Sequence, residues 1–435
     1  MITVEQHLER VLAAVRPLAP QRLPLDQAHG CVLAEEVTAL LAVPPFDNSA
    51  MDGFAVRAAD VAAAEDGAPV RLRVVGDVPA GSPARPPVEP GTAVRVMTGA
   101  PIPPGADAVV PVEHTDQAAG PGQALPAVVE VRRPAAPGAH LRGAGEDVTP
   151  GAVVLRAGTP LRARDLSTAA SVGHGALLVH PPVRVGVLST GSELVPPGQT
   201  PDAGQIPDSN HILVAGMVRE AGALPVLLGA VADDAAALRA RLAENLGRVD
   251  AVVTTGGVSA GAYDVVKEVL APLGEVAFEQ VAMQPGKPQG FGVLREGADG
   301  PASGAGQGAP DGPAATEAGV PIFCLPGNPV SVFVSFQVFV APALRRLRAL
   351  VGDAGPLAAA VAATGWRCPP GRRQYMPVVV DGTDGTGALR VRPATAGGSG
   401  SHLVASLALA DALAVVDAEV DAVREGDAVR VMMVP

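Results

Sequence analysis

The stretch Val183-Arg-Val-Gly-Val-Leu-Ser-Thr-Gly-Ser-Glu193 decides the fold class, because an apolar β-type run passes directly into a polar, glycine-containing loop. The pattern recurs along the chain. The predicted strands lie at 183–188, 224–231, 250–254, 276–282, 290–294 and 320–325, and the predicted helices lie at 211–221, 235–246, 265–270 and from residue 330. Alternation of this kind is typical of a parallel, doubly wound sheet.

The rest of the chain shows two further changes of pattern. Short β-prone runs separated by Pro and Gly turns occur between 70 and 140, and short strands return after about 350. Residues 1–43 are interpreted as helices, and a helix is predicted at 163–172. We therefore predict a multidomain α/β plus β protein. Its domains are a split helical, linking domain (1–43 and 141–180), an inserted β-rich domain (44–140), an α/β domain (181–345) and a small C-terminal β domain (346–435).

Composition excludes several classes of protein. The chain has 435 residues, a net charge of −12 and no Lys/Arg-rich stripe, which argues against nucleic-acid binding. Cys31, Cys324 and Cys368 are scattered, which fits a reducing compartment and argues against disulfides or a cysteine zinc site. Early acidic residues, Glu5 and Glu9, argue against a signal peptide, and no apolar run is long enough for a membrane span. We therefore expect a cytoplasmic protein.

The segment from Pro44 to Val56 places an unusual number of polar groups between two phenylalanines. It contains two carboxylates, Asp47 and Asp52, together with an amide, a hydroxyl and a glycine. Pro residues at its start favour an extended entry, and Asp-Asn-Ser is turn chemistry. The alternative to a functional loop is an acidic surface turn.

Polar loops follow three of the predicted strands of the α/β domain. Ligands bind beyond the carboxyl ends of strands in such sheets. Ser189, Thr190 and nearby backbone N–H groups suit an anion, and Glu193 could hold a metal. The next loop, 254–261, contains Gly256, Gly257 and Ser259 and is followed by Asp264; its backbone N–H groups suit a phosphate. The third loop, 325–331, also leads into a helix.

Charged residues near these loops extend the pattern. Lys287 lies in a tight Pro-Gly turn where it could face an oxyanion, although an exposed turn lysine is the alternative. Asp233 and Asp234 follow a strand and precede a helix, so helix capping alone could explain them. The chain contains no Walker A, dinucleotide-binding or Ser-His-Asp signature. Carboxylates beside phosphate-binding loops indicate metal-assisted chemistry on a phosphorylated ligand.

Six motifs in order resemble the molybdopterin molybdenumtransferase family, the bacterial relatives of the gephyrin E domain. The resemblance spans essentially the whole chain. The motifs are Pro45-Phe-Asp-Asn-Ser-Ala-Met-Asp-Gly-Phe-Ala55, Arg95-Val-Met-Thr-Gly-Ala-Pro101, Gly143-Ala-Gly-Glu-Asp147, Ser189-Thr-Gly-Ser-Glu193, Thr255-Gly-Gly-Val-Ser-Ala-Gly261 and Leu325-Pro-Gly-Asn-Pro-Val-Ser331.

The resemblance implies the last step of molybdenum cofactor assembly, with the 181–345 segment as the molybdopterin-binding domain. Adenylylated molybdopterin and molybdate would be the substrates. Mg2+ or another divalent cation would assist hydrolysis of the pyrophosphate-type bond, AMP would leave, and molybdenum would be inserted at the dithiolene. Family members are elongated homodimers whose site lies at the subunit interface. Protein partners would include the adenylyltransferase and molybdoenzyme-maturation proteins.

The resemblance also assigns roles to particular residues of this sequence. Catalytic positions are Asp52, Asp147 and Asp264, and the expected metal ligands are Glu193, Asp233 and Asp264. Among the substrate-binding positions, the resemblance assigns Thr98, and it matches Lys287, Ser331, Arg372 and Ser401 to the molybdate pocket. The loop chemistry described above adds Ser189, Thr190, Gly256, Gly257 and Ser259.

Several alternatives remain open from the sequence. Arg373 adjoins Arg372, and Ser399 competes with Ser401 for the same role. Related chains often carry lysine at the positions of Gln284 and, in some cases, Gln280, so oxyanion binding is expected to be weaker here unless an arginine substitutes. Competing functions are a molybdopterin adenylyltransferase and a non-enzymatic scaffold of the gephyrin type. The sequence does not distinguish molybdate from tungstate, nor does it identify the divalent metal or the enzymes that receive the cofactor.

Overall fold

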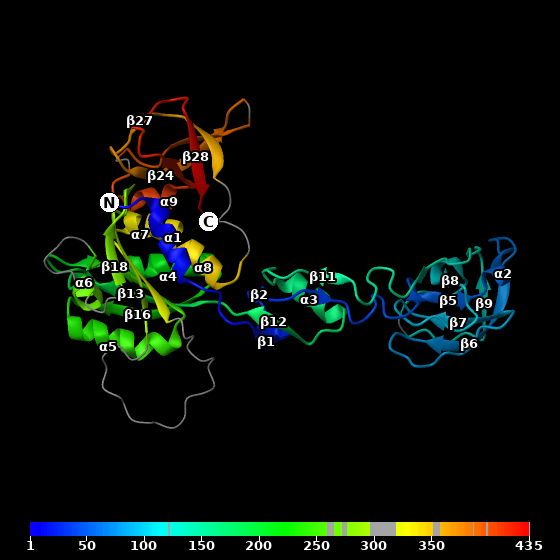
Figure 1. Ribbon diagram of the computed structural model, residues 1–435. Coiled ribbons are helices and arrows are strands. Elements are labelled where there is room, and N and C mark those ends of the chain that lie inside the picture. Colours follow the sequence, from blue (N-terminus) through cyan, green and yellow to red (C-terminus); the bar gives the residue numbers. More distant parts are fainter. Residues whose placement is uncertain are drawn as a thin grey trace, which may run out of the picture.

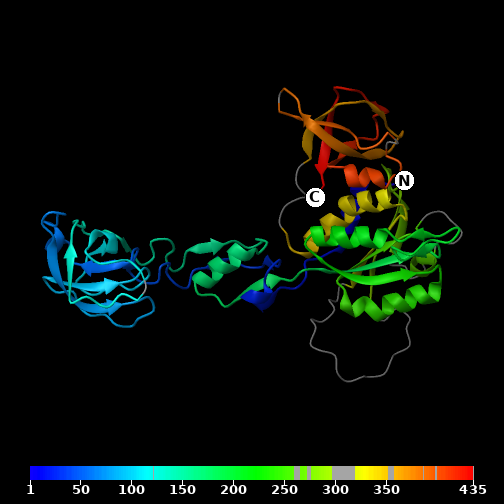
Figure 2. The ribbon, with the colours of Figure 1, turned by 180° about the vertical axis from the view of Figure 1, so that it is seen from behind.

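The computed structural model is an elongated molecule with three bodies in a row and a fourth stacked on one end (Figures 1 and 2). An inserted body of β-strands occupies one end, a small linking body lies in the middle, and an α/β body forms the other end beneath a C-terminal barrel. The structure describes residues 1–120, 122–258, 265–271, 276–295, 319–350, 357–385, 387–396 and 399–434.

The α/β body is built on a six-stranded sheet in the order β16-β13-β17-β21-β20-β18. Its strands are β13 (Arg184–Thr190), β16 (Leu224–Val231), β17 (Ala251–Thr255), β18 (Val276–Gln280), β20 (Pro288–Leu294) and β21 (Val320–Leu325). Its helices are α4 (Asn210–Glu220), α5 (Ala235–Asn245), α6 (Val265–Leu270), α7 (Pro329–Ser335), the π-helical η5 (Phe336–Val340) and α8 (Ala341–Leu347). A short pair, β14 (Leu194–Val195) and β15 (Ile206–Pro207), follows β13.

The expectation of an all-parallel sheet is wrong at one edge. β16, β13, β17 and β21 are parallel, but β20 is antiparallel to both β21 and β18. A parallel connection needs a crossover of a dozen or more residues. The connection from Gln280 to Pro288 is too short for one, so β18 and β20 form a hairpin-like pair.

Two cores cover the two faces of this sheet. In β13, Val185 and Val187 pack into one core with Val214 of α4 and Phe336 of η5. Leu188 points into the other core, which contains residues of α5 and α6 such as Leu238 and Val266. Because successive side chains in a strand point to opposite faces, this alternation describes a sheet with helices on both sides.

Residues 1–43 are not helical as a whole, which corrects the sequence interpretation. Only α1 (Val4–Ala14) forms an α-helix there, and it begins with the expected capping box between Thr3 and Gln6. The helix packs on the α/β body against α8, β20 and η5. Residues 21–38 instead form short β-strands and a 3-10 turn. In β1, the partly buried Gln21 and Leu23 alternate with the exposed Arg22 and Pro24, which is the period of a strand and not of a helix.

Two adjacent segments of the chain join the linking body to the inserted body. The linking body contains β1 (Gln21–Pro24), the 3-10 turn η1 (Leu25–Gln27), β2 (Val32–Leu33), β3 (Val37–Thr38), β11 (Val153–Leu155), α3 (Ala163–Ser171) and β12 (Ala176–His180). β4 (Asn48–Ser49) and β10 (Leu141–Arg142) pair where the chain enters and leaves the inserted body. That body contains β5 (Gly53–Val56), α2 (Ala58–Val61), β6 (Val70–Val78), β7 (Thr92–Val96), β8 (Ala108–Pro111), η2 (Val112–His114) and β9 (Val128–Val131).

The C-terminal barrel is a closed sheet, because β24 pairs with both β25 and β26 while β22 and β28 complete the ring. Closure leaves few free strand edges. The additional strand β19 comes from the α/β body and pairs in parallel with the start of β24. The elements are β19 (Met283–Gln284), β22 (Ala358–Ala362), β23 (Trp366–Arg367), β24 (Arg373–Thr383), β25 (Leu389–Pro393), α9 (Ala405–Leu409), β26 (Ala412–Val416), β27 (Ala422–Val423) and β28 (Ala428–Met433).

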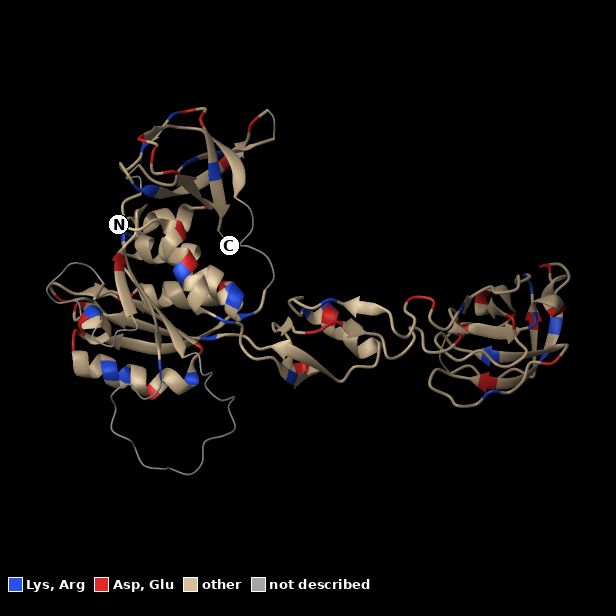
Figure 3. Ribbon diagram, in the orientation of Figure 1, with Lys and Arg blue, Asp and Glu red and all other residues tan. Residues whose placement is uncertain are grey.

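One helical stretch in the described part of the chain, Pro329–Leu347, is long and apolar enough to cross a membrane. Its most apolar window is 72% buried inside the protein, as in the core helix of a folded domain. Basic and acidic residues are interspersed over all four bodies (Figure 3), and no body carries a continuous basic stripe along its described ribbon.

Buried His7 on α1 gives the fold a dependence on pH. Its ring is 2% exposed, lies edge-on to Phe339 with centroids 4.7 Å apart, and places Nδ1 3.5 Å from Glu279 Oε2. Burial lowers the pKa of His7 below its ordinary value of 6.5, although Glu279 opposes the shift. The unfolded chain therefore takes up a proton that the folded chain resists, so the contribution to stability is complete above pH 6.5 and is lost as the pH falls through the folded pKa.

We expect the melting temperature to fall as the pH is lowered from about 7.5 to about 5.5, and to fall less steeply in a His7→Gln variant. Thermal unfolding followed by circular dichroism at several pH values measures both slopes. The exposed His29 provides the control variant, His29→Gln. Equal slopes for wild type and His7→Gln would contradict this assignment.

Candidate functional site

The main pocket lies at the carboxyl ends of the central strands and has a volume of about 670 Å3. Its walls include the loops after β13, β17 and β21, the turn before β20, and three residues contributed from the C-terminal barrel. The site residues predicted from the sequence that line it are Thr190, Glu193, Asp233, Gly256, Gly257, Lys287, Ser331, Arg372 and Ser401.

The glycine loop after β17 can only be built from glycine at two positions. Gly256 has a φ of +93° and a Cβ there would lie 2.5 Å from the carbonyl oxygen of Thr190. Gly257 has a φ of +66° and a Cβ there would lie 2.7 Å from Cγ2 of Val266. The left-handed conformation and the close approach together exclude other residues. The loop therefore presents bare backbone to the pocket, which suits a phosphate.

Ser189 lies beneath this wall and does not line the pocket. It is 1% exposed, and its hydroxyl donates to Oδ1 of Asp208 at 3.0 Å while accepting from the hydroxyl of Thr255 at 3.3 Å. The strand register explains this, because Ser189 and Thr190 point to opposite faces of β13. The expectation that Ser189 contacts substrate is therefore not supported by its position, whereas Thr190 does line the pocket.

The two described carboxylates expected to bind a metal are held differently. Asp233 accepts a hydrogen bond from the N–H of Ser192 at 3.0 Å, and its own N–H donates to the Ser192 hydroxyl at 3.0 Å. Its neighbour Asp234 caps α5 by accepting from the N–H of Ala237 at 2.8 Å. Helix capping thus explains Asp234 but not Asp233. The Glu193 side chain lies over Gly191 at the same loop.

A complete metal site is not visible among the described residues, since no group of three His, Cys, Asp or Glu side chains converges there. The third expected ligand, Asp264, and the expected substrate contact Ser259 lie outside the described residues. Carboxylate oxygens are the ligands that Mg2+ prefers, so Glu193 and Asp233 suit this ion by donor type.

Lys287 lies in a turn that is held in place by buried hydrogen bonds from Gln289. The side-chain amide of Gln289 donates to the carbonyl oxygen of Gly286 at 2.6 Å and to the hydroxyl of Ser335 at 2.7 Å. Gln289 is 2% exposed, so this contact is buried. Lys287 and Arg372 are the basic side chains among the described residues that line the pocket. Gln284 lines it too, whereas Gln280 does not.

The C-terminal barrel separates the alternatives that the sequence leaves open. Arg372 lines the pocket, while the adjacent Arg373 bonds to Glu5 and lies 3.2 Å from Asp417. Both serines line the pocket. The hydroxyl of Ser399 accepts from Gln374 at 2.9 Å, and that of Ser401 accepts from Asn328 at 3.0 Å.

Sequence reasoning missed Asp208 and Asn210, which also line the pocket. Asp208 is 4% exposed, and its Oδ2 lies 3.0 Å from Nδ1 of His211. Asn210 donates to the carbonyl oxygen of Gly327 at 2.6 Å, linking the start of α4 to the loop after β21. The available signal was the run Pro207-Asp-Ser-Asn210 immediately before a helix, which is also a common capping sequence.

Three predicted residues lie far from this pocket. The N–H and the hydroxyl of Thr98 both donate to Oδ1 of Asp52, at 2.6 and 2.8 Å, so the inserted body brings these two exposed residues together. Asp147 is exposed near the junction with the linking body, where its N–H donates to the carbonyl oxygen of Val43 at 3.0 Å. In one chain the linking body separates the inserted body from the α/β body (Figures 1 and 2), whose loops form most of the pocket wall.

Three family models match consecutive parts of the chain. Residues 2–173 match the MoeA N-terminal region (domain I and II), residues 186–346 match a probable molybdopterin binding domain, and residues 359–434 match the MoeA C-terminal region (domain IV).

Relatives with assigned names match over most of their length. The chain is 42% identical over 392 residues to molybdopterin molybdenumtransferase 2 of Mycobacterium tuberculosis, with 89% of each chain covered. It is 36% identical to molybdopterin molybdenumtransferase 1 of the same species, covering 99% of this chain and 98% of that one. A solved structure of the molybdopterin biosynthesis MoeA protein from Pyrococcus horikoshii has a TM-score of 0.74 and 30% identity, covering 100% of this chain and 99% of that one.

Proposed function

The chain belongs to the MoeA family of molybdopterin molybdenumtransferases, enzymes of molybdenum cofactor biosynthesis, and we propose the following division of labour in its site. The enzyme takes adenylylated molybdopterin and molybdate, hydrolyses the phosphoanhydride with one water, releases AMP and inserts molybdenum at the dithiolene. The observation that carries the proposal is that one pocket gathers a glycine loop, carboxylates, two cations and several serines.

The phosphates of the adenylylated substrate bind at the glycine loop. Gly256 and Gly257 line the pocket with bare backbone, and Thr190 lines it from the neighbouring strand. The N–H of Gly256 donates to the carbonyl oxygen of Leu325 at 3.0 Å, so it braces the loop against β21 and is not one of the phosphate donors. Ser259, which follows Val258 in the sequence, is included as a further phosphate contact on the basis of the sequence alone. These groups orient the anhydride so that its two phosphates are held apart from the oxyanion.

Glu193 and Asp233, with Asp264 as the third ligand expected from the family resemblance, hold a divalent cation such as Mg2+. The bound ion supplies charge neutralisation for the phosphates. Asp233 is suited to this role because its hydrogen bond with Ser192 orients the carboxylate at the pocket wall. The carboxylates of the chain also hold the attacking water in line with the phosphate to be released as AMP.

Molybdate is held by Lys287, Arg372, Ser331 and Ser401. Two fixed positive charges balance a dianion, and two hydroxyl groups donate hydrogen bonds to its oxygens. Ser399, which lines the same pocket, is an additional donor. Tungstate has the same charge and shape, so this part of the site does not discriminate between the two ions.

The second part of the site comes from another copy of the chain. Asp52, Thr98 and Asp147 have catalytic or substrate-binding roles in the family resemblance, yet none of them lines the pocket. Asp52 and Thr98 belong to the inserted body, at the opposite end of the molecule from the α/β body (Figure 1), and Asp147 lies near the junction of the inserted and linking bodies. A homodimer in which the inserted body of one protomer meets the pocket of its partner would bring them together. The elongated shape of the single chain supports this arrangement.

Neither competing function accounts for the pocket equally well. A molybdopterin adenylyltransferase would need only the α/β body, whereas Arg372, Ser399 and Ser401 are contributed from the C-terminal barrel. A non-enzymatic scaffold would have no use for carboxylates in the pocket. We also propose that the enzyme acts in the cytoplasm, where it receives substrate from the adenylyltransferase and passes the cofactor to molybdoenzyme-maturation proteins.

A discharge assay tests the proposed function. Purified protein is mixed with adenylylated molybdopterin, Mg2+ and either molybdate or tungstate, and AMP release and active cofactor are measured. We expect AMP release and cofactor formation to require the protein, the divalent cation and an oxyanion together. Consumption of ATP and unmodified molybdopterin to make the adenylylated compound would instead identify an adenylyltransferase.

A further inference from the structure

The N-terminal segment holds together the two pieces of chain that carry the oxyanion-binding residues. The N–H of Ile2 donates to the carbonyl oxygen of Gln280 at 2.9 Å, and the N–H of Ala282 donates back to Ile2 at 2.8 Å. The N–H of Arg373 donates to the carbonyl oxygen of Ala282 at 2.9 Å. Residue 2, the segment leading to Lys287 and the start of β24 thus lie side by side, although they are far apart in the sequence.

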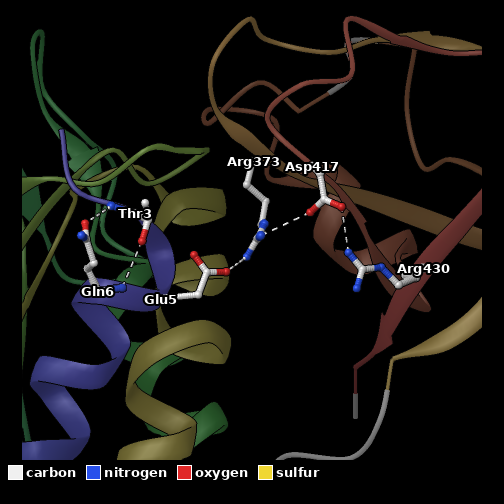
Figure 4. A network of polar contacts seen from close by, with 6 residues as sticks. All are labelled: Thr3, Glu5, Gln6, Arg373, Asp417 and Arg430. Atoms are coloured by element: carbon white, nitrogen blue, oxygen red, sulfur yellow. Dashed lines mark hydrogen bonds and ion pairs between the residues drawn. The ribbon is translucent and has the colours of Figure 1, made fainter.

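Ion pairs extend this backbone contact (Figure 4). The guanidinium of Arg373 donates to Glu5 through one terminal nitrogen and lies 3.2 Å from Asp417 through the other. Arg430 donates to the second oxygen of Asp417 at 2.9 Å. Glu5 lies in the first turn of α1, beside the Thr3 and Gln6 capping box that fixes where the helix begins. The network therefore joins α1 to the C-terminal barrel.

The contacts of Glu5 favour its charged form. Burial alone would raise the pKa of this carboxyl, but a backbone hydrogen bond and the bond from Arg373 outweigh it, so the pKa lies below its ordinary value. The Arg373 guanidinium stays charged at any working pH. Both partners of the pair are therefore charged at neutral pH.

Arg373 directly follows the pocket residue Arg372. Arg372 lies in the bend that directly precedes β24, and β24 begins at Arg373. Because the main chain of Arg373 is held by Ala282 and its side chain by Glu5 and Asp417, the adjacent backbone of Arg372 is held beside the pocket that Arg372 lines. The next residue, Gln374, is 2% exposed and donates to the Ser399 hydroxyl, which also lines the pocket.

We propose that Glu5 and Arg373 are positioning residues for oxyanion binding, in that their ion pair fixes Arg372 at the pocket wall. This inference rests on the proposed function, because it presumes that Arg372 binds molybdate. Neither Glu5 nor Arg373 lines the pocket, so neither is expected to contact the oxyanion itself. The first turn of α1 thereby controls a site whose other residues lie more than 250 positions later in the sequence.

Glu5→Gln is the most informative variant, because Glu5 is 63% exposed at its side chain and its loss should not unfold the protein. Partly exposed ion pairs have modest energies, so we expect half-saturation by molybdate to require about 3- to 5-fold more oxyanion. The turnover at saturating molybdate and the binding of AMP should stay within about 2-fold of wild type, since only the position of Arg372 is disturbed. Arg373→Gln should behave in the same way, and Arg373→Lys, which keeps the charge, should fall between Gln and wild type.

The matched control is Arg22→Gln, which breaks an exposed ion pair with Glu35 in the linking body. It should leave molybdate half-saturation unchanged. The difference between wild type and Glu5→Gln should shrink in about 0.5 M NaCl, because salt screens exposed charges.

The outcomes separate this inference from the proposed function. If molybdate does not bind the wild-type protein in calorimetry, or if Arg372→Gln leaves its affinity unchanged, the proposed oxyanion site is wrong. If Arg372→Gln weakens molybdate binding but Glu5→Gln and Arg373→Gln do not, the oxyanion site stands and the positioning role is wrong. Equal losses of turnover, AMP binding and melting temperature in Glu5→Gln would show a structural role only and would also overturn it.

Discussion

Replacing Lys287 with alanine raises the molybdate concentration needed for half-maximal AMP release by about 10- to 150-fold, because a charge-assisted hydrogen bond contributes about 1.5–3 kcal/mol. The expected change is large because the described lining of the pocket offers only one other basic side chain, Arg372. Binding of adenylylated molybdopterin should change little, since the glycine loop is left intact. Molybdate titration in the discharge assay and calorimetry with the adenylylated substrate measure the two effects.

The chain offers a matched control for this substitution. Lys267 is the only other lysine of the protein and lies exposed on α6, outside the pocket lining. Lys267→Ala should leave the molybdate requirement unchanged. Gln284→Lys is the reciprocal test, since Gln284 lines the pocket and an added cation there should lower the molybdate requirement. An unchanged half-saturating concentration in Lys287→Ala would mean that the oxyanion binds elsewhere.

The positions of the pocket loops could be predicted from the sequence because they depend on local chemistry. Each loop follows a β-prone run and contains glycine, hydroxyl or acidic residues, and parallel strands bring their carboxyl ends to one edge. Gly256 and Gly257 illustrate the point, since their positive φ angles and the close approach of Thr190 and Val266 together exclude a side chain. Helix limits were also close: α4 and α5 begin and end within one residue of the predicted bounds.

The edge of the α/β sheet and the N-terminal region were not predictable in the same way. Whether β18 and β20 run parallel or antiparallel depends on the path of the chain that connects them, and the apolar runs in the sequence do not predict this path. The strand β22 (Ala358–Ala362) was missed because a run of alanines favours a helix by local propensity, and only its pairing with β25 and β28 makes it a strand. Tertiary pairing outweighs local preference in both cases.

The sequence could not show which of two similar neighbouring residues faces the pocket. Ser189 and Thr190 are adjacent and chemically alike, so only the register of β13 shows that Thr190 faces the pocket and Ser189 faces Asp208. Arg372 and Arg373 pose the same problem, and the answer depends on Glu5, which lies in a different part of the chain. The contact of Ser189 with Asp208 and that of Arg373 with Glu5 cannot be predicted from the residues next to them in the sequence.

Mixing two inactive variants should restore activity, which is the sharpest test of a site shared between protomers. Asp52 directly precedes β5 of the inserted body and Glu193 follows β13 of the α/β body, and these two bodies lie at opposite ends of the elongated chain (Figure 1). The two variants are Asp52→Ala and Glu193→Ala. Each homodimeric variant should lose most of its activity, because every site in it lacks one of the two carboxylates. Co-expression with two different affinity tags allows the mixed dimer to be purified and its AMP release to be measured.

The arrangement of the site determines the result for the mixed dimer. If Asp52 and Glu193 act from different protomers, one of the two sites has both carboxylates intact and the other lacks both, so the mixed dimer recovers about half of wild-type activity. If the two residues act from the same protomer, each site lacks one carboxylate and no activity returns. Asp52→Asn is the control for folding, since it retains an oxygen that can accept the hydrogen bonds of Thr98 while removing the charge. A monomeric protein with full activity would exclude the shared site altogether, because in a single chain the linking body keeps Asp52 away from the pocket.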